Sequence, residues 1–135
     1  MSETTGIPHI KVVNLTPHEV RVITDDGEVI YKPSGKVARL QTVNRMLNIE
    51  GLPPVVKTEV IDIEGLPAPE PGVVYLASTL VAQYATRFGR LDVLSPDTGP
   101  ESAVRNEAGQ IIGVQRLQRF WAGVIARKSE KKTAI

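Results

Sequence analysis

The segment Asp97-Thr98-Gly99, followed along the chain by Arg105, combines four groups that could hold a nucleotide. A carboxylate and a hydroxyl can hydrogen-bond ribose hydroxyls, while a glycine amide and a guanidinium can bind phosphate oxygens. Prolines at both ends of the segment Ser95–Pro100 favour a rigid loop, and rigid loops position ligands well. The alternative for Asp97 is a structural role, in which its carboxylate caps the turn.

Asp-Thr-Gly also occurs in aspartic proteases, where two carboxylates share one proton. The single copy in this chain would need a second chain to complete such a pair, and the flanking prolines do not fit that context. We therefore favour binding over proteolysis for this segment.

Positive charge is concentrated towards the C-terminal end of the chain. Residues 1–114 carry ten basic and fourteen acidic side chains, whereas residues 115–135 carry six basic and one acidic. Arg116 and Arg119 lie among apolar residues, which makes them candidates for a fixed phosphate or carboxylate partner, because a guanidinium can donate two parallel hydrogen bonds. A surface or intersubunit salt bridge is the alternative.

His18 and Asn14 belong to the stretch Asn14-Leu15-Thr16-Pro17-His18, at a predicted junction of strand, turn and strand. Asn and Thr side chains usually bond turn backbone, so a structural role is favoured for this stretch. A general base would need a nucleophile or an orienting partner, and Glu19 alone supplies neither. The chain also lacks the GxxxxGK, GxGxxG and GxSxG motifs, which favours a binding protein over an enzyme.

Composition excludes several further classes. The chain has 135 residues, a net charge of +1, no Cys and two His. Thiol chemistry, disulfides and Cys-type metal sites are therefore excluded, and we expect no metal site and no cofactor. The near-neutral charge argues against binding to DNA or RNA polymers, and no apolar run approaches the roughly 20 residues that cross a bilayer. We expect a cytoplasmic protein.

Short β-branched runs between Gly and Pro residues predict a β-rich fold. The first forty or so residues predict an antiparallel meander that includes a hairpin at Asp25-Asp26-Gly27. A helix is predicted over Thr79–Phe88, with Ser78 as its N-cap and Gly89 at its end. We expect an α+β fold, mainly antiparallel sheet with one or two helices, and oligomeric. The predicted strands are 10–15, 20–24, 28–31, 36–40, 55–63, 73–76, 91–94, 102–106 and 111–120.

The sequence pattern does not define the secondary structure of two segments. The pattern weakens over 41–54, and residues 115–126 fit either a strand or a helix. We expect one β-rich ligand-binding domain over 1–126, followed by a basic, disordered tail over 127–135.

Several segments together resemble small phage proteins of the Thoeris anti-defence type, the first described class of nucleotide-signal sponges. The segments that carry the resemblance span most of residues 10–120: Asn14–Val20, Pro33-Ser34-Gly35 with Ala38-Arg39, Tyr75–Gln83, Arg90–Val93, Pro96–Pro100, Val104-Arg105, Gly109 and Ile112-Gly113-Val114.

The resemblance implies a β-rich subunit that assembles into dimers and hexamers in the host cytoplasm. Such proteins bind and sequester cyclic nucleotide signals without cleaving them. The main ligand would be glycocyclic ADP-ribose made by TIR-domain proteins, and some members also hold cyclic oligonucleotides of the CBASS pathway at separate sites. Tight affinity and slow release, not turnover, would then matter.

Carried onto this chain, the resemblance implies a ligand site that stacks adenine, binds phosphates and satisfies ribose hydroxyls. The chain departs from the family pattern at Gln115-Arg116-Leu117, which leaves the adenine-stacking partner open. Phe120, beside Trp121, is a candidate, although adjacent aromatics more often serve a core or an interface. The candidate ligand-binding residues are Arg39, Asp97, Thr98, Arg105 and Arg116, with His18 and Asn14 as further candidates.

Two other classes stay open. A phage structural or assembly protein would be a β-rich oligomer without a small ligand. A nucleotide hydrolase is disfavoured because the chain lacks clusters of metal ligands.

Overall fold

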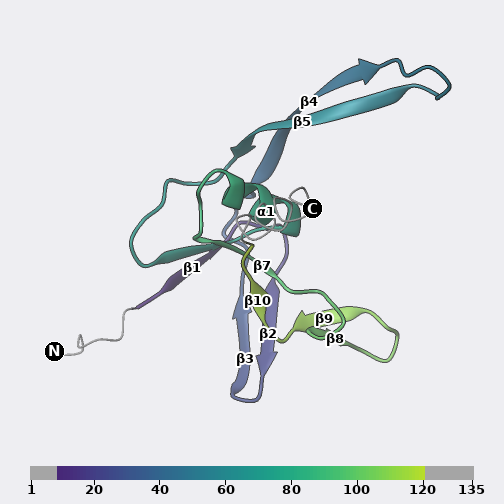
Figure 1. Cartoon of the computed structure of the whole chain (residues 1–135). Helices are drawn as coiled ribbons and strands as arrows, with labels where there is room; N and C mark the ends of the chain where they lie inside the picture. The colour runs from purple at the N-terminus through teal and green to yellow at the C-terminus, as the bar shows by residue number, and fades with distance from the viewer. Residues whose placement is uncertain (1–8, 121–135) are drawn as a thin grey trace, which may run out of the picture.

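Residues 9–120 are described by the computed structural model (Figure 1). They form a mixed α+β fold in which a helix and short strands meet at a small core, and a long hairpin projects from it. The elements are β1 (Lys11–Asn14), β2 (Val20–Thr24), β3 (Gly27–Tyr31), β4 (Arg39–Leu47), β5 (Val55–Glu64), β6 (Val73–Leu76), α1 (Thr79–Arg87), β7 (Val93–Pro96), β8 (Ala103–Arg105), β9 (Ile111–Val114) and β10 (Leu117–Gln118).

The first sheet has the strand order β1-β6-β7-β10 and carries helix α1. Strands β1, β6 and β7 are parallel, and β10 pairs antiparallel with β7. Because parallel neighbours need a crossover connection, α1 bridges β6 and β7. The hydroxyl of Ser78 accepts a hydrogen bond from the amide of Val81 and so caps the helix. The core between helix and sheet comprises Leu15, Ala38, Tyr75, Ala77, Val81, Ala82, Ala85 and Val93.

The second sheet has the strand order β3-β2-β9-β8. The β2–β3 hairpin turns at Gly27, whose φ of 127° suits glycine. Strand β9 lies parallel to β2 so closely that a Cβ on Gly113 would be 2.9 Å from Cδ1 of Ile23. A Cβ there would also lie 3.1 Å from the carbonyl oxygen of Arg21, so a side chain at this position would have to displace Ile23 and press on the backbone of β2, and glycine avoids both contacts.

Asn14, which is buried, ties the end of β1 to the neighbouring segments. Its Nδ2 donates to the carbonyls of His18 and Tyr31, at 2.8 and 2.9 Å. Its Oδ1 accepts from the amide and the hydroxyl of Thr16. The side chain thus links β1, the following turn and β3.

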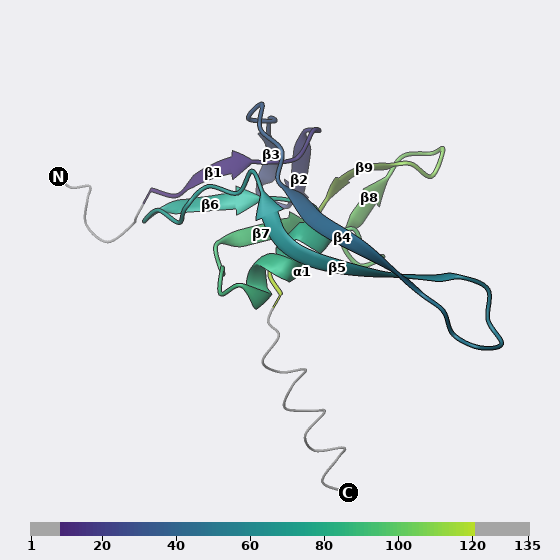
Figure 2. The same cartoon turned by 90° about the horizontal axis from the view of Figure 1, so that it is seen from above.

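Strands β4 and β5 form a separate two-stranded sheet, which we call the arm (residues 39–64). Figures 1 and 2, turned by 90° from each other, both show the end of the arm standing clear of the other elements. Ile61 is an extra residue on β5, because Gln41 opposes Asp62 while Thr42 opposes Val60.

The α+β class, the predominance of antiparallel pairing, the β2–β3 hairpin and the helix with its Ser78 cap are confirmed. The meander is wrong in two pairings: β1 lies beside β6 and not beside β2, and β4 pairs with β5 and not with β3. The strand expected over 36–40 starts at Arg39 and continues to Leu47, through the stretch where the pattern weakens. Pairing between distant segments, as between β1 and β6, leaves no local signal. Strand β4 is exposed on most of its length, so it lacks the alternation of a half-buried strand.

Two further boundaries differ from those predicted. Ser95 and Pro96 belong to β7 instead of the loop, because Pro96 lies at the strand end opposite Leu117. The strand predicted over 111–120 is interrupted after Val114, and β10 resumes at Leu117. The remainder of the ambiguous segment, 121–126, and the predicted tail, 127–135, lie outside the described residues.

Candidate functional site

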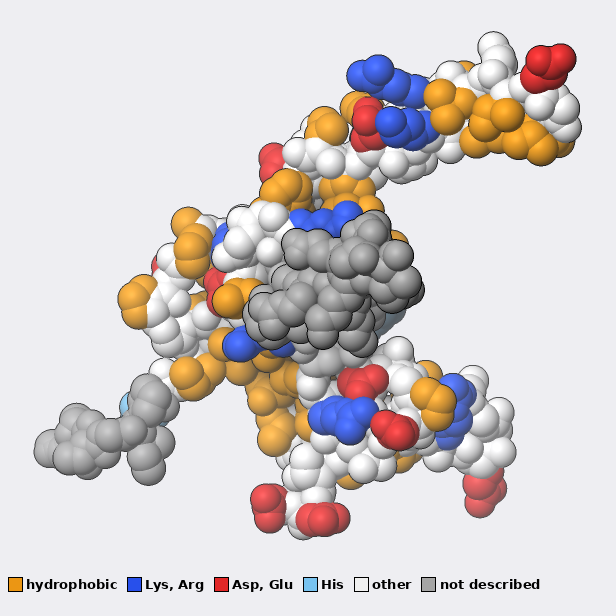
Figure 3. Space-filling model, viewed as in Figure 1, with side chains coloured by type: hydrophobic (Ala, Val, Ile, Leu, Met, Phe, Trp, Pro, Cys, Tyr) orange, Lys and Arg blue, Asp and Glu red, His pale blue; other side chains and the backbone are white. Residues whose placement is uncertain are grey.

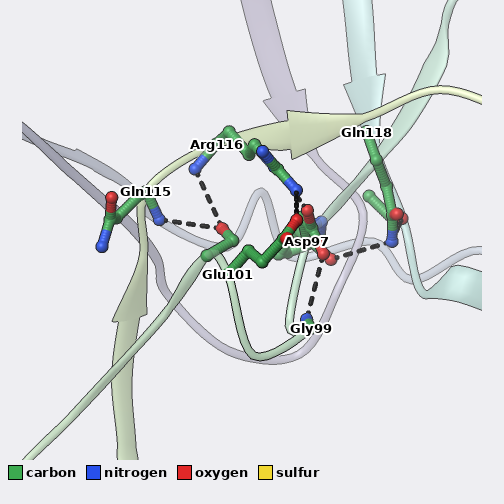
Figure 4. A network of polar contacts seen from close by, with 9 residues as sticks. Asp97, Gly99, Glu101, Gln115, Arg116 and Gln118 are labelled. Atoms are coloured by element: carbon green, nitrogen blue, oxygen red, sulfur yellow. Dashed lines mark hydrogen bonds and ion pairs between the residues drawn. The ribbon is translucent and has the colours of Figure 1, made fainter.

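Asp97 and Arg116 form the centre of the candidate site, on the loop after β7 and just before β10. Nε of Arg116 lies 2.6 Å from Oδ2 of Asp97 (Figure 4). The other carboxylate oxygen of Asp97 accepts a hydrogen bond from the amide of Gly99. The backbones of the two residues are also hydrogen-bonded, because the amide of Asp97 donates to the carbonyl of Arg116. Asp97 therefore both caps its own turn and fixes a guanidinium.

Ser102, which is fully buried, connects the loop that carries Asp97 to the residues before β10. Its hydroxyl accepts hydrogen bonds from the amides of Gln115 and Arg116, at 3.0 and 3.2 Å. Its own amide donates to the carbonyl of Gly99. These bonds hold the loop against the residues before β10. Figure 4 shows Gln115 and Arg116 lying beside the loop residues Asp97 and Glu101.

Gln118 adds a third attachment on the β10 side. Its Nε2 donates to the hydroxyl of Ser95 and to the carbonyl of Pro96. Within residues 9–120 no buried side-chain nitrogen or oxygen lacks a hydrogen-bond partner. The rigidity expected of the loop thus comes from side-chain bonds to β10 as well as from its prolines.

Glu101 also reaches the guanidinium, but loosely. Its Oε1 lies 3.4 Å from Nη2 of Arg116, and the Glu101 side chain is 84% exposed, whereas that of Asp97 is 15% exposed. An exposed, long contact of this kind contributes little and is easily displaced. The two carboxylates and one guanidinium give the cluster a net charge of −1, so an anion would bind more favourably once Glu101 has moved aside.

The contact between Asp97 and Arg116 shifts the pKa of both side chains. The hydrogen bond from Arg116, followed by that from the Gly99 amide, lowers the pKa of the Asp97 carboxyl below its ordinary value. The hydrogen bond to Asp97 in turn raises the pKa of Arg116 above its ordinary value. Both groups are therefore charged at neutral pH.

Thr98 is exposed and lines a shallow hollow of about 200 Å³ beside β2 and β9. Arg21, Ile112 and Gly113 also line it. Pockets that enclose a small ligand usually measure about 300–1,000 Å³, so this hollow alone is too small to enclose a dinucleotide.

The structure does not bring Arg39 and Arg105 into the cluster. Arg39 begins the arm, and Arg105 ends β8, where its guanidinium donates to the carbonyl of Gly109. Across residues 9–120, no hydrogen bond or ion pair joins either arginine to Asp97 or Arg116. Both side chains are exposed, so each remains a separate cation at the surface.

Asn14 and His18 lie in a different cluster, at the end of β1. All the hydrogen-bonding groups of the Asn14 side chain are used inside the chain, and His18 contributes its backbone carbonyl there. This arrangement supports the structural interpretation of the stretch. The imidazole of His18 is exposed.

Phe120 is half-buried and packs against the hydrophobic core, which is the use that adjacent aromatics more often have. Its carbonyl accepts a hydrogen bond from Thr86 of α1. Trp121 lies outside the described residues.

Glu101, Ser102 and Gln118 were missed by the sequence analysis. A buried Ser that accepts two backbone amides leaves no spacing pattern, and Gln118 acts across 23 positions of sequence. Glu101 could have been suspected, since it lies in the same loop as Asp97. Among residues 9–120 no three carboxylate or imidazole groups are grouped as metal ligands, and no helix is long and apolar enough to cross a membrane.

Comparisons of this chain with protein-family models, with curated proteins and with solved structures found no match. The function proposed below is therefore inferred from the residues, from their geometry and from the resemblance of the sequence segments named above.

Proposed function

We propose that this protein is a phage anti-defence protein that binds and sequesters cyclic nucleotide immune signals in the host cytoplasm without cleaving them. The ligand class is glycocyclic ADP-ribose from TIR proteins, and cyclic oligonucleotides of CBASS are a second ligand class. The observation that carries the proposal is the orientation of Arg116 by Asp97. The resemblance of the sequence to Thoeris anti-defence sponges supplies the identity of the ligand.

An oriented guanidinium suits a pyrophosphate. Asp97 occupies Nε of Arg116, and displacement of the exposed Glu101 would release Nη2. A phosphate could then accept hydrogen bonds from the outer edge of the guanidinium, in the geometry that arginine offers to phosphate oxygens. Because Asp97 already fixes the side chain, little conformational entropy is lost on binding.

Thr98 would contribute the contact to ribose. Its side chain is exposed beside the hollow between β2 and β9, one residue from the guanidinium's partner. A hydroxyl that both donates and accepts matches the 2′- and 3′-hydroxyls of ribose. Arg105 would act as a second, more distant cation for the phosphates.

The arrangement favours holding a ligand over transforming it. Within residues 9–120, the side chains bonded to Arg116 are those of Asp97, which orients it, and Glu101, an exposed carboxylate to which no nucleophile is hydrogen-bonded. Sequestration requires a slow dissociation rate instead of chemistry. We therefore assign no catalytic residue.

Equilibrium dialysis with glycocyclic ADP-ribose tests the role of the guanidinium. Arg116→Ala is expected to weaken binding by about 10- to 100-fold, the loss typical of a charged hydrogen-bonding pair. Arg45→Ala is the matched control, since Arg45 is exposed and lies on the arm, away from the cluster around Arg116. Unchanged binding by both Arg116→Ala and Arg105→Ala would overturn the site.

A structural or assembly protein is the second candidate function, and the arm favours it. An extended hairpin with exposed apolar side chains is a device for joining subunits. Homo-oligomers, dimers or hexamers, are expected under either function. The absence of any retained nucleotide, together with stable assemblies, would favour this candidate.

A further inference from the structure

Both outer edges of the arm lack a partner strand in the part of the chain that the structure describes. Strand β4 pairs with β5 and with no other strand there. An isolated two-stranded hairpin is marginally stable in water, and a long strand edge is a template for pairing with another chain. The arm therefore has the properties of an element that is completed by association.

Exposed apolar side chains lie on both strands of the arm and on its end (Figure 3). Association would remove some of this surface from water, which is favourable in proportion to the apolar area covered. The exposed large apolar residues of the arm are Val43, Met46, Leu47, Ile49, Leu52, Val56 and Ile61.

The sequence of β5 is complementary to itself. Around Thr58 the strand reads Val56-Lys57-Thr58-Glu59-Val60. On each side of Thr58 a charged residue comes first and a valine second, and the two charges are opposite. If two copies of β5 pair antiparallel about a twofold axis at Thr58, Lys57 of each copy opposes Glu59 of the other. Val56 then opposes Val60. A twofold axis creates each of these contacts twice.

The charged side chains already lie on one face of the arm. Glu59 contacts both Arg45 and Lys57, at 3.4 and 3.6 Å. A twofold axis perpendicular to the sheet keeps this face on the same side in both copies, so opposite charges would be neighbours across the new pair. Cross-strand pairs of opposite charge stabilise a sheet, and like charges destabilise it.

The other edge does not offer this complementarity. A twofold axis at Val43 of β4 would place Arg45 opposite Gln41 and Met46 opposite Leu40, with no ion pair. The bulge at Ile61 interrupts β5 immediately after Val60. The regular part of the β5 edge is therefore the part whose sequence is self-complementary.

We propose that two copies of this chain associate through the free edge of β5, antiparallel and centred on Thr58, to form a four-stranded sheet in the order β4-β5-β5-β4. This inference goes beyond the proposed function, because it concerns the arm and requires no ligand.

Charge reversal tests the register by sedimentation equilibrium over a range of protein concentrations. Glu59→Lys and Lys57→Glu each place like charges opposite each other twice, so each is expected to raise the dimer dissociation constant at least about tenfold. The double variant restores opposite charges and should return within a few-fold of the wild type. Glu50→Lys, the same charge change in the exposed turn of the arm, should leave association unchanged.

Disulfide trapping gives an independent measurement, because the chain has no Cys of its own. Thr58→Cys should form a covalent dimer on mild oxidation, since the two copies of residue 58 oppose each other. Val56→Cys should not, because the two copies of residue 56 would be separated by four residues along the strands, roughly 13 Å. A monomeric wild type, association insensitive to both charge reversals, or equal trapping of the two cysteine variants would each overturn the proposal.

Discussion

Asp97 holds the guanidinium of Arg116 through a 2.6 Å contact between Oδ2 and Nε, across 19 positions of sequence. The contact occupies one edge of the guanidinium and leaves the other towards Glu101 and solvent. An arginine fixed in this way is prepared for an anionic ligand, since its side-chain freedom is already lost before binding.

Asp97→Ala should weaken nucleotide binding even though Asp97 need not touch the ligand. The variant removes a negative charge, which by itself would favour an anion, but it also releases Arg116 from its fixed position. If orientation dominates, we expect a loss of about 3- to 30-fold, smaller than the loss for Arg116→Ala. Calorimetric titration of both variants checks the order, and tighter binding by Asp97→Ala would contradict an orienting role.

Asn14→Ala should lower stability without changing the affinity of the folded protein for its ligand. The variant leaves the carbonyls of His18 and Tyr31 and the groups of Thr16 without their buried partner. We expect a loss of about 2–4 kcal/mol in the free energy of unfolding, because unsatisfied buried polar groups cost about 1–3 kcal/mol each. Urea unfolding measures the change. A stable variant that fails to bind would instead place Asn14 in the ligand site.

Asp92→Asn should lower stability in a pH-dependent way. Nε and Nη2 of Arg90 both donate to Asp92 at 2.9 Å, and these bonds lower the pKa of the Asp92 carboxyl. Because the pKa of Asp92 is lower in the folded than in the unfolded chain, its ionisation stabilises the folded state at pH values above about 3.9, the pKa of an aspartate in an unfolded chain. This contribution is lost as the pH falls through the lower pKa of the folded state.

For Asp92→Asn we therefore expect a loss of about 1–2 kcal/mol at pH 7. The difference between the wild type and the variant should shrink below about pH 4. Thermal unfolding from pH 2.5 to 7 provides the profile, and a difference independent of pH would show that the loss is not electrostatic.

Gly65→Ala should be more destabilising than Gly51→Ala. Both glycines have a positive φ, 82° and 89°, but a Cβ on Gly65 would lie 2.5 Å from the carbonyl oxygen of Val37, whereas nothing lies within 4 Å at Gly51. The backbone strain of about 1–2 kcal/mol is common to both variants, so their difference reports the clash. We expect Gly65→Ala to lose about 2 kcal/mol more in chemical unfolding. Equal losses would show that the backbone beside Val37 yields.

Local signals in the sequence predicted the elements whose structure is local. Gly27 in the β2–β3 turn and the cap from Ser78 to Val81 depend on residues a few positions apart. The pairing of β1 with β6 joins residues about 60 positions apart, so neither strand carries a sign of it. The arm has a different reason: β4 pairs with the next strand along the chain, but it is exposed on most of its length and so lacks the alternation of a half-buried strand.

At the candidate site, residue types were predictable but their distances were not. Asp97 and Arg116 were both candidates, and their contact depends on how Ser102 holds the loop against the backbone before β10. Arg39 and Arg105 were selected for the same chemistry and lie outside that contact network. The hydrogen-bonding capacity of Asn14 was recognised, and the structure directs it inward.

Capture and release of the nucleotide tests the central claim most directly. The purified protein is mixed with glycocyclic ADP-ribose, freed of unbound ligand, denatured by heat, and the released material is identified by chromatography and mass spectrometry. The account predicts that intact ligand is recovered in a fixed ratio to protein, and that Arg116→Ala recovers far less. A cleaved product would contradict sequestration, and the absence of any retained nucleotide would contradict nucleotide binding itself.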